Sequence, residues 1–369
     1  MSEFLFVTWD GGGNVGPAVE IASELSRRGH RVRFLGQRQQ REFFEHTGFD
    51  FTEYRNPGSW TAVGKRGALK NAVGFLQLIT GRSLGRDLLA EVKAARTDVV
   101  VIDCLLFGAL DFAARAGLQH AVLVHSLYEA IDTRMAGGAP GLVARVRGLR
   151  PRTLWADASL IVAATLQELD RFPGSELPPH LHYTGPALPA VSPPGLKPPA
   201  ETRILVSLST TYVPGQSAVV QRILDALADM PAKVVVTTGP AIDPAALRAP
   251  AGVDVHSFLP HTQVMPDMSL MIGHGGHSTT MLALAHGLPL LILPMNLVFD
   301  QVLIGQAVQR SGAGLTMPSG SAQSEIRSAV ERLLADDSYR QQALRLGADI
   351  RNCHGSQAAA DLLVAMTPD

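Results

Sequence analysis

The sequence predicts an α/β protein built from two doubly wound parallel-sheet domains. Short apolar segments rich in β-branched residues alternate with segments of helical periodicity along most of the chain. A proline-rich stretch near the middle interrupts this alternation, which then starts again. The length of 369 residues suits two domains of ordinary size.

The first half contains apolar runs that read as strands buried on both faces, as in a parallel sheet covered by helices. Between the first two runs, residues 15–28 place Ala18, Ile21, Ala22 and Leu25 on one helical face, and Gly29 is a good helix end. The predicted strands lie within FLFVTWD (4–10), GHRVRFLG (29–36), TDVVVIDCLLFGA (97–109) and HAVLVHS (120–126).

The stretch PALPAVSPPGLKPPAE (186–201) has six prolines in sixteen residues, so we expect an extended linker there. This gives a first domain at 1–190, a linker at 191–201 and a second domain at 202–369, whose last helix is a candidate to pack back on the first domain. The second-half strands are predicted within RILVSLS (203–209), AKVVVTTG (232–239), VDVHSFL (253–259), SLMIGHGG (269–276) and LPLLILPM (288–295).

Residues 60–96 are mildly basic and amphipathic. Two interpretations are open: a helix lying on a membrane surface, or a pair of surface helices that cover the ligand site of the first domain. We favour the second, because Gly74, Gly81 and Gly85 are expected to interrupt any long helix.

Composition excludes several classes of function. The formal charge of -1 gives no basic surface for nucleic acid. Cys104 and Cys353 are too few for a disulfide framework and read as reduced thiols. The sequence shows no membrane-length apolar run and no secretion signal, so we expect a cytoplasmic protein without stable membrane insertion. A homodimer remains open.

The segment MIGHGGHSTTMLALAHG (271–287) carries the most specific chemistry. A strand delivers His274, Gly275 and Gly276 to its end, and a helix begins near Ser278 or Thr279, with Ser278 as its expected cap. Glycines allow close backbone approach, and a helix N-terminus offers N–H groups and a positive dipole end. The site suits a diphosphate without a metal, with His274 as a donor that can be cationic. A zinc pair at His274 and His277 is a weaker alternative, because no third ligand is near in sequence.

The longer stretch FLPHTQVMPDMSLMIGHGGHSTTMLALAHGLPLLILPMNLVFDQ (258–301) resembles the nucleotide-sugar motif of family 1 glycosyltransferases, which belong to the UDP-glycosyltransferase superfamily and include bacterial antibiotic enzymes. The resemblance implies the GT-B fold: two Rossmann-like domains facing a central cleft. It also implies that the first domain binds the acceptor and the second binds the donor.

The resemblance assigns donor contacts to several residues. His274, Gly275 and Gly276 would hold the pyrophosphate, and Asp300 with Gln301 would bind sugar hydroxyls, although Asp300 also suits a helix cap. His261 stands where many relatives have Gln. The other donor contacts implied are Ser278, Thr279 and Thr210 near phosphate, and Phe258 with Leu259 near the base.

The catalytic base is missing from its usual place. The family's first turn carries a His that takes the acceptor proton, whereas this chain reads GNVGP with Asn14 there, and a carboxamide cannot act as a base. Asp103 matches the family's partner Asp and is one candidate base. His125 at the end of another strand is a second, Asp10 is a further one, and an acidic acceptor needing no strong base is the remaining alternative. Asn14 itself is expected either to bond the acceptor or to hold a left-handed turn.

These features together predict an inverting, metal-independent glycosyltransferase without a cofactor. Its donor would be a UDP- or dTDP-sugar and its acceptor a small hydrophobic natural product. An O-glycoside is the expected product, with C- and N-glycosides open. The alternatives are a non-catalytic activator or scaffold, which the missing His favours, and a nucleotide-sugar epimerase.

Overall fold

The computed structural model describes residues 1–56, 60–62, 67–171, 177–195, 201–209 and 211–368. The chain forms two compact units, each with its own sheet. The first unit consists of Met1–Leu188 together with Cys353–Asp369, and the second consists of Pro189–Asn352. Both sheets are entirely parallel, which confirms the predicted α/β class.

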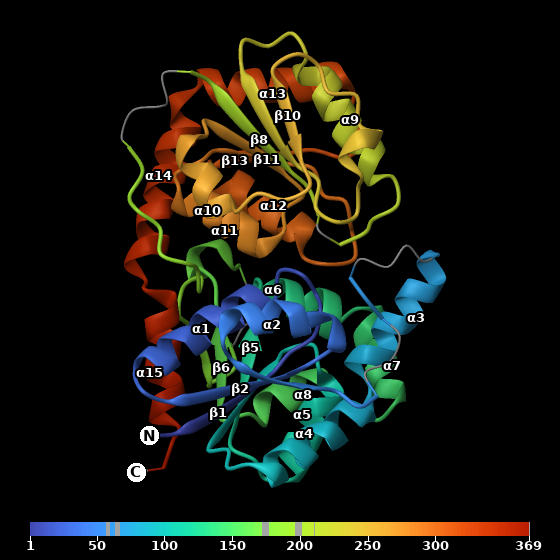
Figure 1. Cartoon of the computed structure of the whole chain (residues 1–369), viewed down its shortest axis with the longest axis vertical. Coiled ribbons are helices and arrows are strands. Elements are labelled where there is room, and N and C mark those ends of the chain that lie inside the picture. The colour runs from blue at the N-terminus through green and yellow to red at the C-terminus, as the bar shows by residue number, and fades with distance from the viewer. Residues whose placement is uncertain (57–59, 63–66, 172–176, 196–200, 210, 369) are drawn as a thin grey trace. The chain divides into compact units, whose positions relative to one another are not determined.

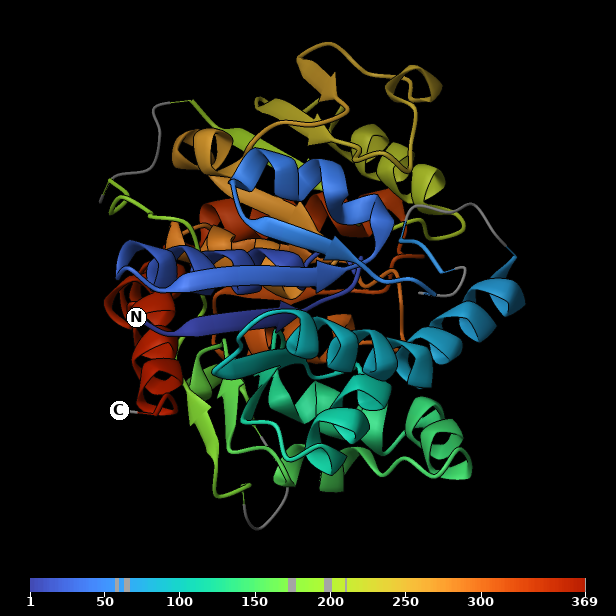
Figure 2. The ribbon, with the colours of Figure 1, turned by 60° about the horizontal axis from the view of Figure 1, so that its bottom comes forward.

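The first unit contains a seven-stranded sheet in the order β3-β2-β1-β4-β5-β6-β7. The order reverses at β1, which pairs with β2 on one side and with β4 on the other; the β1 and β2 arrowheads point to the same edge in Figure 2. Ligands bind open sheets at the carboxyl ends of strands beside such a reversal. The strands are β1 (Glu3–Val7), β2 (Arg31–Gly36), β3 (Asp50–Glu53), β4 (Val99–Asp103), β5 (His120–Val124), β6 (Leu160–Ala163) and β7 (Leu181–Tyr183).

Helices cover both faces of this sheet (Figure 1), which is why β4 and β5 are buried along their whole length. The helix α1 buries the face that its periodicity predicts, with Ala18, Ile21 and Leu25 packed in one core with Phe4 and Phe34. The helices of this unit are α1 (Val15–Arg27), α2 (Arg41–Thr47), α3 (Ala68–Ile79), α4 (Arg82–Ala94), α5 (Phe107–Arg115), α6 (Tyr128–Ala130), α7 (Ala139–Val146), α8 (Pro151–Ala156) and α15 (Gly355–Ala365), with short 3₁₀ or π segments at Arg38–Gln40, Ile131–Ala136 and Gln167–Leu169.

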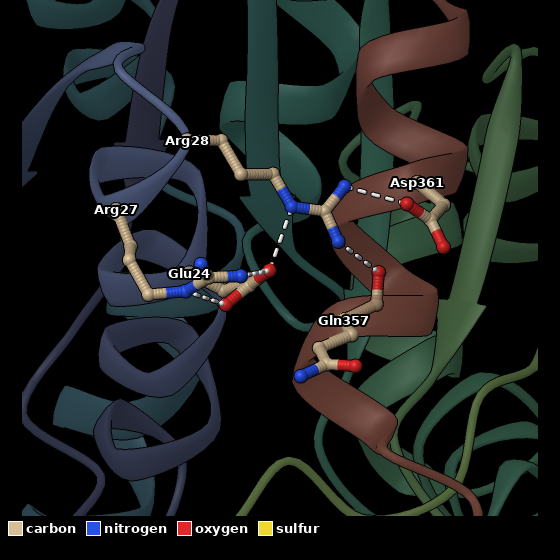
Figure 3. Close-up of polar contacts among 5 residues, drawn as sticks. All are labelled: Glu24, Arg27, Arg28, Gln357 and Asp361. Carbon is tan, nitrogen blue, oxygen red and sulfur yellow. Dashed lines mark hydrogen bonds and ion pairs between the residues drawn. The ribbon is translucent and has the colours of Figure 1, made fainter.

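The last helix, α15, packs against α1 within the first unit. Its Ala359, Ala360 and Leu363 are fully buried in the core that α1 shares. Arg28 links the two helices at the surface, because its guanidinium donates to the Asp361 carboxylate and to the Gln357 carbonyl (Figure 3). The same guanidinium contacts Glu24, which also pairs with Arg27.

The second unit contains a six-stranded sheet in the order β10-β9-β8-β11-β12-β13. Its strands are β8 (Arg203–Ser207), β9 (Lys233–Thr237), β10 (Val253–His256), β11 (Leu270–Gly273), β12 (Leu290–Ile292) and β13 (Gly314–Thr316). Its helices are α9 (Gln216–Leu227), α10 (His261–Val264), α11 (His277–Ala285), α12 (Gln301–Arg310), α13 (Gln323–Ala335) and α14 (Asp337–Asn352), with 3₁₀ segments at Pro244–Ala246 and Met265–Asp267.

Two sequence predictions about local structure need correction. The run 97–109 forms a strand only at Val99–Asp103, and its end already belongs to α5. Of the three glycines expected to break helices, only Gly81 lies between helices, while Gly74 and Gly85 lie inside α3 and α4. Gly85 is tolerated there because the Phe112 ring packs over it, leaving no space for a Cβ.

None of the helices in the described part of the chain combines the length and the apolar character needed to span a bilayer.

Candidate active site

Three polar side chains meet at the carboxyl edge of the first sheet. Asp103 is the last residue of β4, and His125 directly follows β5, which pairs with β4. Asn14 is the N-cap residue of α1, which follows the glycine turn after β1. The sheet order places β1, β4 and β5 side by side, so all three residues come from adjacent strand ends.

The Asp103 carboxylate is the centre of this group. Its Oδ2 accepts a hydrogen bond from Asn14 Nδ2 at 3.0 Å and lies 3.1 Å from His125 Nδ1. Its Oδ1 accepts the Leu105 N–H at 3.0 Å. Asp103 is 5% exposed and the His125 side chain 14%, so the pair is largely shielded from water.

The two groups shift each other's pKa. Burial alone would raise the pKa of Asp103, but the His125 charge and the hydrogen bonds from His125, Leu105 and Asn14 lower it below its ordinary value. Burial, the largest single effect, would lower the pKa of His125, but the charges of Asp103 and Cys104 and the hydrogen bonds with both together outweigh burial and raise that pKa well above its ordinary value. The pair is therefore an imidazolium–carboxylate ion pair in the ligand-free protein.

Asn14 has a positioning role in the turn. Its Oδ1 accepts the Gly11 N–H and its Nδ2 also donates to the Trp9 carbonyl, both at 3.1 Å. Its φ of -79° is right-handed, so the expectation of a left-handed Asn is wrong. Gly12 takes the positive φ instead, at 81°. A Cβ at Gly11 would lie 2.6 Å from Asn14 Oδ1, which explains the glycine there.

Asp10 does not join this group within the described structure. Its backbone N–H donates to Gln37, and its carboxylate accepts the Ala62 N–H. Burial raises the pKa of Asp10, and the Ala62 hydrogen bond offsets only part of that effect.

One cluster among the described residues brings three atoms suited to metal binding within 4.8 Å of one another: those of Asp103, Cys104 and His125. The Cys104 thiol lies 3.9 Å from His125 Nδ1, and burial raises its pKa. Asp103 Oδ2 and His125 Nδ1, the atoms that a metal would need, contact each other directly. We therefore describe the group as a hydrogen-bonded dyad with a neighbouring thiol.

An aromatic cluster that sequence reasoning did not single out lies at the end of β1. The Trp9 ring centroid is 5.1 Å from that of Trp60 and 5.8 Å from that of Phe75. All three are less than 10% exposed. The sequence could have indicated Trp9 as a site residue, because Trp9 directly precedes Asp10 at a predicted strand end.

In the second unit, β8 and β11 end together, with Ser207 opposite Gly273. After Gly273 the chain turns through His274 and Gly275, whose φ of 84° favours glycine, into α11. The helix begins at His277, with Gly276 as its N-cap residue and no side-chain cap, so the expectation that Ser278 caps the helix is wrong.

His274 lies over its own turn. A Cβ at Gly276 would be 2.5 Å from His274 Nε2, so the ring covers the entrance to α11. Burial lowers the pKa of His274 to about 4. In the ligand-free protein this imidazole is neutral at pH 7, and the expectation of a cationic donor needs correction. A neutral imidazole still donates one N–H.

The second donor motif packs against this turn. A Cβ at Gly275 would lie 2.9 Å from the Gln301 carbonyl oxygen. Asp300 is the N-cap residue of α12 without a side-chain cap bond, so helix capping does not explain its carboxylate. Gln301 Oε1 accepts the N–H groups of Met295 and Asn296, each at 2.8 Å. Two motifs about 25 residues apart in sequence therefore form one local structure.

The other residues predicted to bind the nucleotide sugar differ in exposure and in contacts. Ser278 and Thr279 lie half-buried in the first turn of α11, Leu259 is half-buried, and Phe258 is 75% exposed. His261 Nε2 lies 3.2 Å from the Thr237 hydroxyl at the end of β9. Thr210 lies outside the described residues.

Comparison with known proteins identifies this arrangement. Residues 221–366 match the family described as Erythromycin biosynthesis protein CIII-like, C-terminal domain. The chain is 28% identical to 4'-demethylrebeccamycin synthase of Lentzea aerocolonigenes, over 93% of this chain and 94% of that protein. It is 24% identical to demethyllactenocin mycarosyltransferase of Streptomyces fradiae, over 98% and 86%.

These relatives identify the chain as a glycosyltransferase. Solved structures agree on the fold of this glycosyltransferase. The glycotransferase of kitacinnamycin superposes with a TM-score of 0.81 at 21% identity, covering 100% of this chain and 99% of that one. A calicheamicin glycosyltransferase gives a TM-score of 0.77 at 24% identity, covering 99% and 98%. These likenesses confirm the predicted GT-B fold, and the named relatives confirm sugar transfer as the activity of the class.

Proposed function

We propose that this glycosyltransferase moves a sugar from a UDP- or dTDP-sugar to a hydroxyl of a small hydrophobic acceptor, with inversion at the anomeric carbon and without a metal. The observation that carries the proposal is the packing of the His274–Gly276 turn against the Gln301 backbone. That contact joins two features in one local structure: the turn that we assign to the diphosphate, and the Asp300–Gln301 pair that we assign to the sugar.

The turn suits the diphosphate. The helix α11 starts at His277, and its first intrahelical bond runs from Thr280 to Gly276. The earliest N–H groups of a helix have no intrahelical acceptor and favour an anion. The His274 imidazole adds a donor above them. One of the solved structures similar to this chain is a glycosyltransferase in complex with dTDP, which supports this ligand class.

The pair at the start of α12 suits the sugar. Gln301 Oε1 is occupied by two backbone N–H groups, so its Nε2 is the group that remains for a sugar hydroxyl. The half-buried Asp300 carboxylate supplies an acceptor beside it. Sugar hydroxyls donate and accept, so a carboxylate with an amide N–H complements them.

The first unit suits the acceptor. The buried Trp9, Trp60 and Phe75 form an apolar cluster at the end of β1, which lies beside the Asp103-bearing strand β4. An open pocket of about 500 Å³ lies along α3, lined by Gly67, Leu69, Lys70 and Val73. Both features favour an apolar acceptor.

The chemistry is a single displacement. The acceptor oxygen forms a bond to the anomeric carbon while the bond from that carbon to the diphosphate oxygen breaks. The electron pair leaves with the diphosphate, where the N–H groups of the turn stabilise the developing charge. One displacement inverts the configuration.

Calorimetry tests the donor site. In the presence of EDTA, dTDP and UDP are titrated into wild-type protein and into His274→Ala. We expect one of the nucleotides to bind, with affinity reduced by roughly 10- to 100-fold in the variant, as for a lost hydrogen bond to a charged group. His182→Ala, an exposed histidine of the first unit, is the matched control and should bind like wild type. Equal binding by all three proteins would contradict the proposed site.

A further inference from the structure

We propose that the catalytic base of this enzyme is His125, positioned by Asp103, and that Asn14 holds Asp103 rather than acting on the acceptor. The base would thus come from the end of β5 instead of the glycine turn after β1. This inference rests on the proposed function, since it assigns the proton-accepting group of that reaction.

His125 has the geometry of an oriented base. Its Nδ1 faces Asp103 Oδ2 at 3.1 Å, so in the neutral imidazole the proton is held on Nδ1 and Nε2 becomes the acceptor. No described residue hydrogen-bonds Nε2, and the side chain retains 14% exposure. A ring nitrogen that accepts a proton on one side while a carboxylate fixes the other is the arrangement that general-base catalysis requires.

Asp103 is poorly placed to act as the base itself. Three donors occupy its two oxygens: Asn14 and His125 on Oδ2 and the Leu105 N–H on Oδ1. A carboxylate stabilised in this way holds its charge and gives up little of it to an incoming proton. Asp103 is therefore a positioning residue.

Asn14 hydrogen-bonds Asp103 without competing with His125 for a proton. It donates to the same Asp103 oxygen that His125 contacts, but it carries no charge. An imidazole at position 14 would place a second titrating group on that oxygen and compete with His125 for the proton. The neutral amide, fixed by Gly11 and by the Trp9 carbonyl, leaves the carboxylate charge to His125.

The proton balance follows from these contacts. His125 Nε2 takes the acceptor proton as the oxygen attacks the anomeric carbon, and the diphosphate leaves with the electron pair of the broken bond. The resulting imidazolium keeps its Nδ1 proton toward Asp103 and returns the Nε2 proton to solvent. No oxidant, reductant or metal enters this balance.

The groups around His125 determine its titration. Asp103 and Cys104 act on it directly, with burial opposing them, and the net effect raises the pKa of His125. Two phenols lie near the pair: the Asp103 charge acts on Tyr54, and the Cys104 charge acts on Tyr128. Burial raises the pKa of both phenols, so both stay neutral. The acceptor reaction should therefore accelerate with rising pH until His125 is deprotonated.

The test uses His125→Asn, whose shorter amide can still donate to Asp103 but has no basic nitrogen. Wild type, His125→Asn and the control His182→Asn, at an exposed histidine of the same unit, are assayed with UDP- and dTDP-glucose and a series of para-substituted phenols of graded acidity. We expect kcat/KM of His125→Asn to fall by about 100- to 10,000-fold with the least acidic phenols. The loss should shrink as the phenol becomes more acidic, and His182→Asn should stay within a few-fold of wild type.

Nucleotide affinity separates this inference from the proposed function. Suppose that dTDP or UDP binds wild type and His125→Asn equally, and that the two proteins also turn over weakly acidic phenols at equal rates. Then His125 is not the base and the inference is overturned. A loss independent of phenol acidity would also overturn it, because it would indicate a structural role. If wild type uses no phenol, donor hydrolysis by water is compared in the same way. If neither nucleotide binds, the proposed function itself fails, and the inference with it.

Discussion

Asn14 donates a hydrogen bond of 3.0 Å to the carboxylate of Asp103. By resemblance, Asn14 stands at the position of the family's base and Asp103 at the position of its partner acid, so this contact links the two positions. In the mechanism proposed here, Asn14 positions Asp103 and His125 takes the proton.

Removing this contact should weaken catalysis without abolishing it. In Asn14→Ala, Asp103 loses one of three donors, and the Trp9 carbonyl loses one donor but keeps the Gly11 N–H. We expect kcat/KM to fall by about 10-fold, consistent with a lost hydrogen bond to a charged group. Nucleotide affinity, measured by calorimetry, should be unchanged. A variant with wild-type kcat/KM would show that Asn14 does not position Asp103.

The pH dependence of the reaction should reflect the His125–Asp103 pair. The base must be deprotonated to work, so kcat/KM of wild type should rise with pH through a midpoint above 6.5, the ordinary pKa of histidine. In Asp103→Asn the counter-charge is gone while burial remains, so the midpoint should move to lower pH as the maximal rate falls. Rate profiles measured between pH 5 and 10 decide this. An unchanged midpoint would contradict coupling between the two groups.

The donor turn should not tolerate side chains. Gly275 has a φ of 84°, and an added Cβ would lie 2.9 Å from the Gln301 carbonyl, so Gly275→Ala should weaken nucleotide binding by at least ~10-fold. Gly320→Ala is the matched control in the same unit, because nothing lies within 4 Å of its added Cβ. Calorimetry of both variants gives the comparison. Similar affinities for the two would argue against the turn as the diphosphate site.

Gln301 should show separable structural and binding roles. Gln301→Leu leaves the Met295 and Asn296 N–H groups without an acceptor, so the free energy of unfolding should fall by roughly 1–3 kcal/mol. Gln301→Glu keeps those acceptor bonds but replaces the amide donor with oxygen. We expect it to unfold like wild type in urea while KM for the nucleotide sugar rises, and an unchanged KM would exclude Gln301 from sugar binding.

Long uninterrupted apolar runs made much of the fold predictable. The strands β1, β4 and β5 are buried on both faces, and their ends were read correctly enough to place Asp103 and His125 at the sheet edge. Four of the shorter or more exposed strands escaped prediction, although β10, β11 and β12 were predicted at similar length. β3 alternates exposed with half-buried residues, β7 and β13 have three residues each, and β6 is only four residues long.

The contacts within the site could not be read from the sequence. Whether His125 meets Asp103 depends on the register between β4 and β5 and on side-chain rotation, neither of which leaves a local pattern. The same holds for Gly275 against Gln301, which depends on how α12 packs beside β12 and the turn. The lowered pKa of His274 depends on burial that only the folded turn creates.

The most direct test of the account is the stereochemistry of one reaction. Wild-type protein is incubated in EDTA with an α-linked UDP- or dTDP-glucose and a phenol, and the product is followed by NMR. We expect a β-glycoside together with one equivalent of free nucleoside diphosphate. An α-glycoside, or turnover that requires an added metal ion, would contradict it.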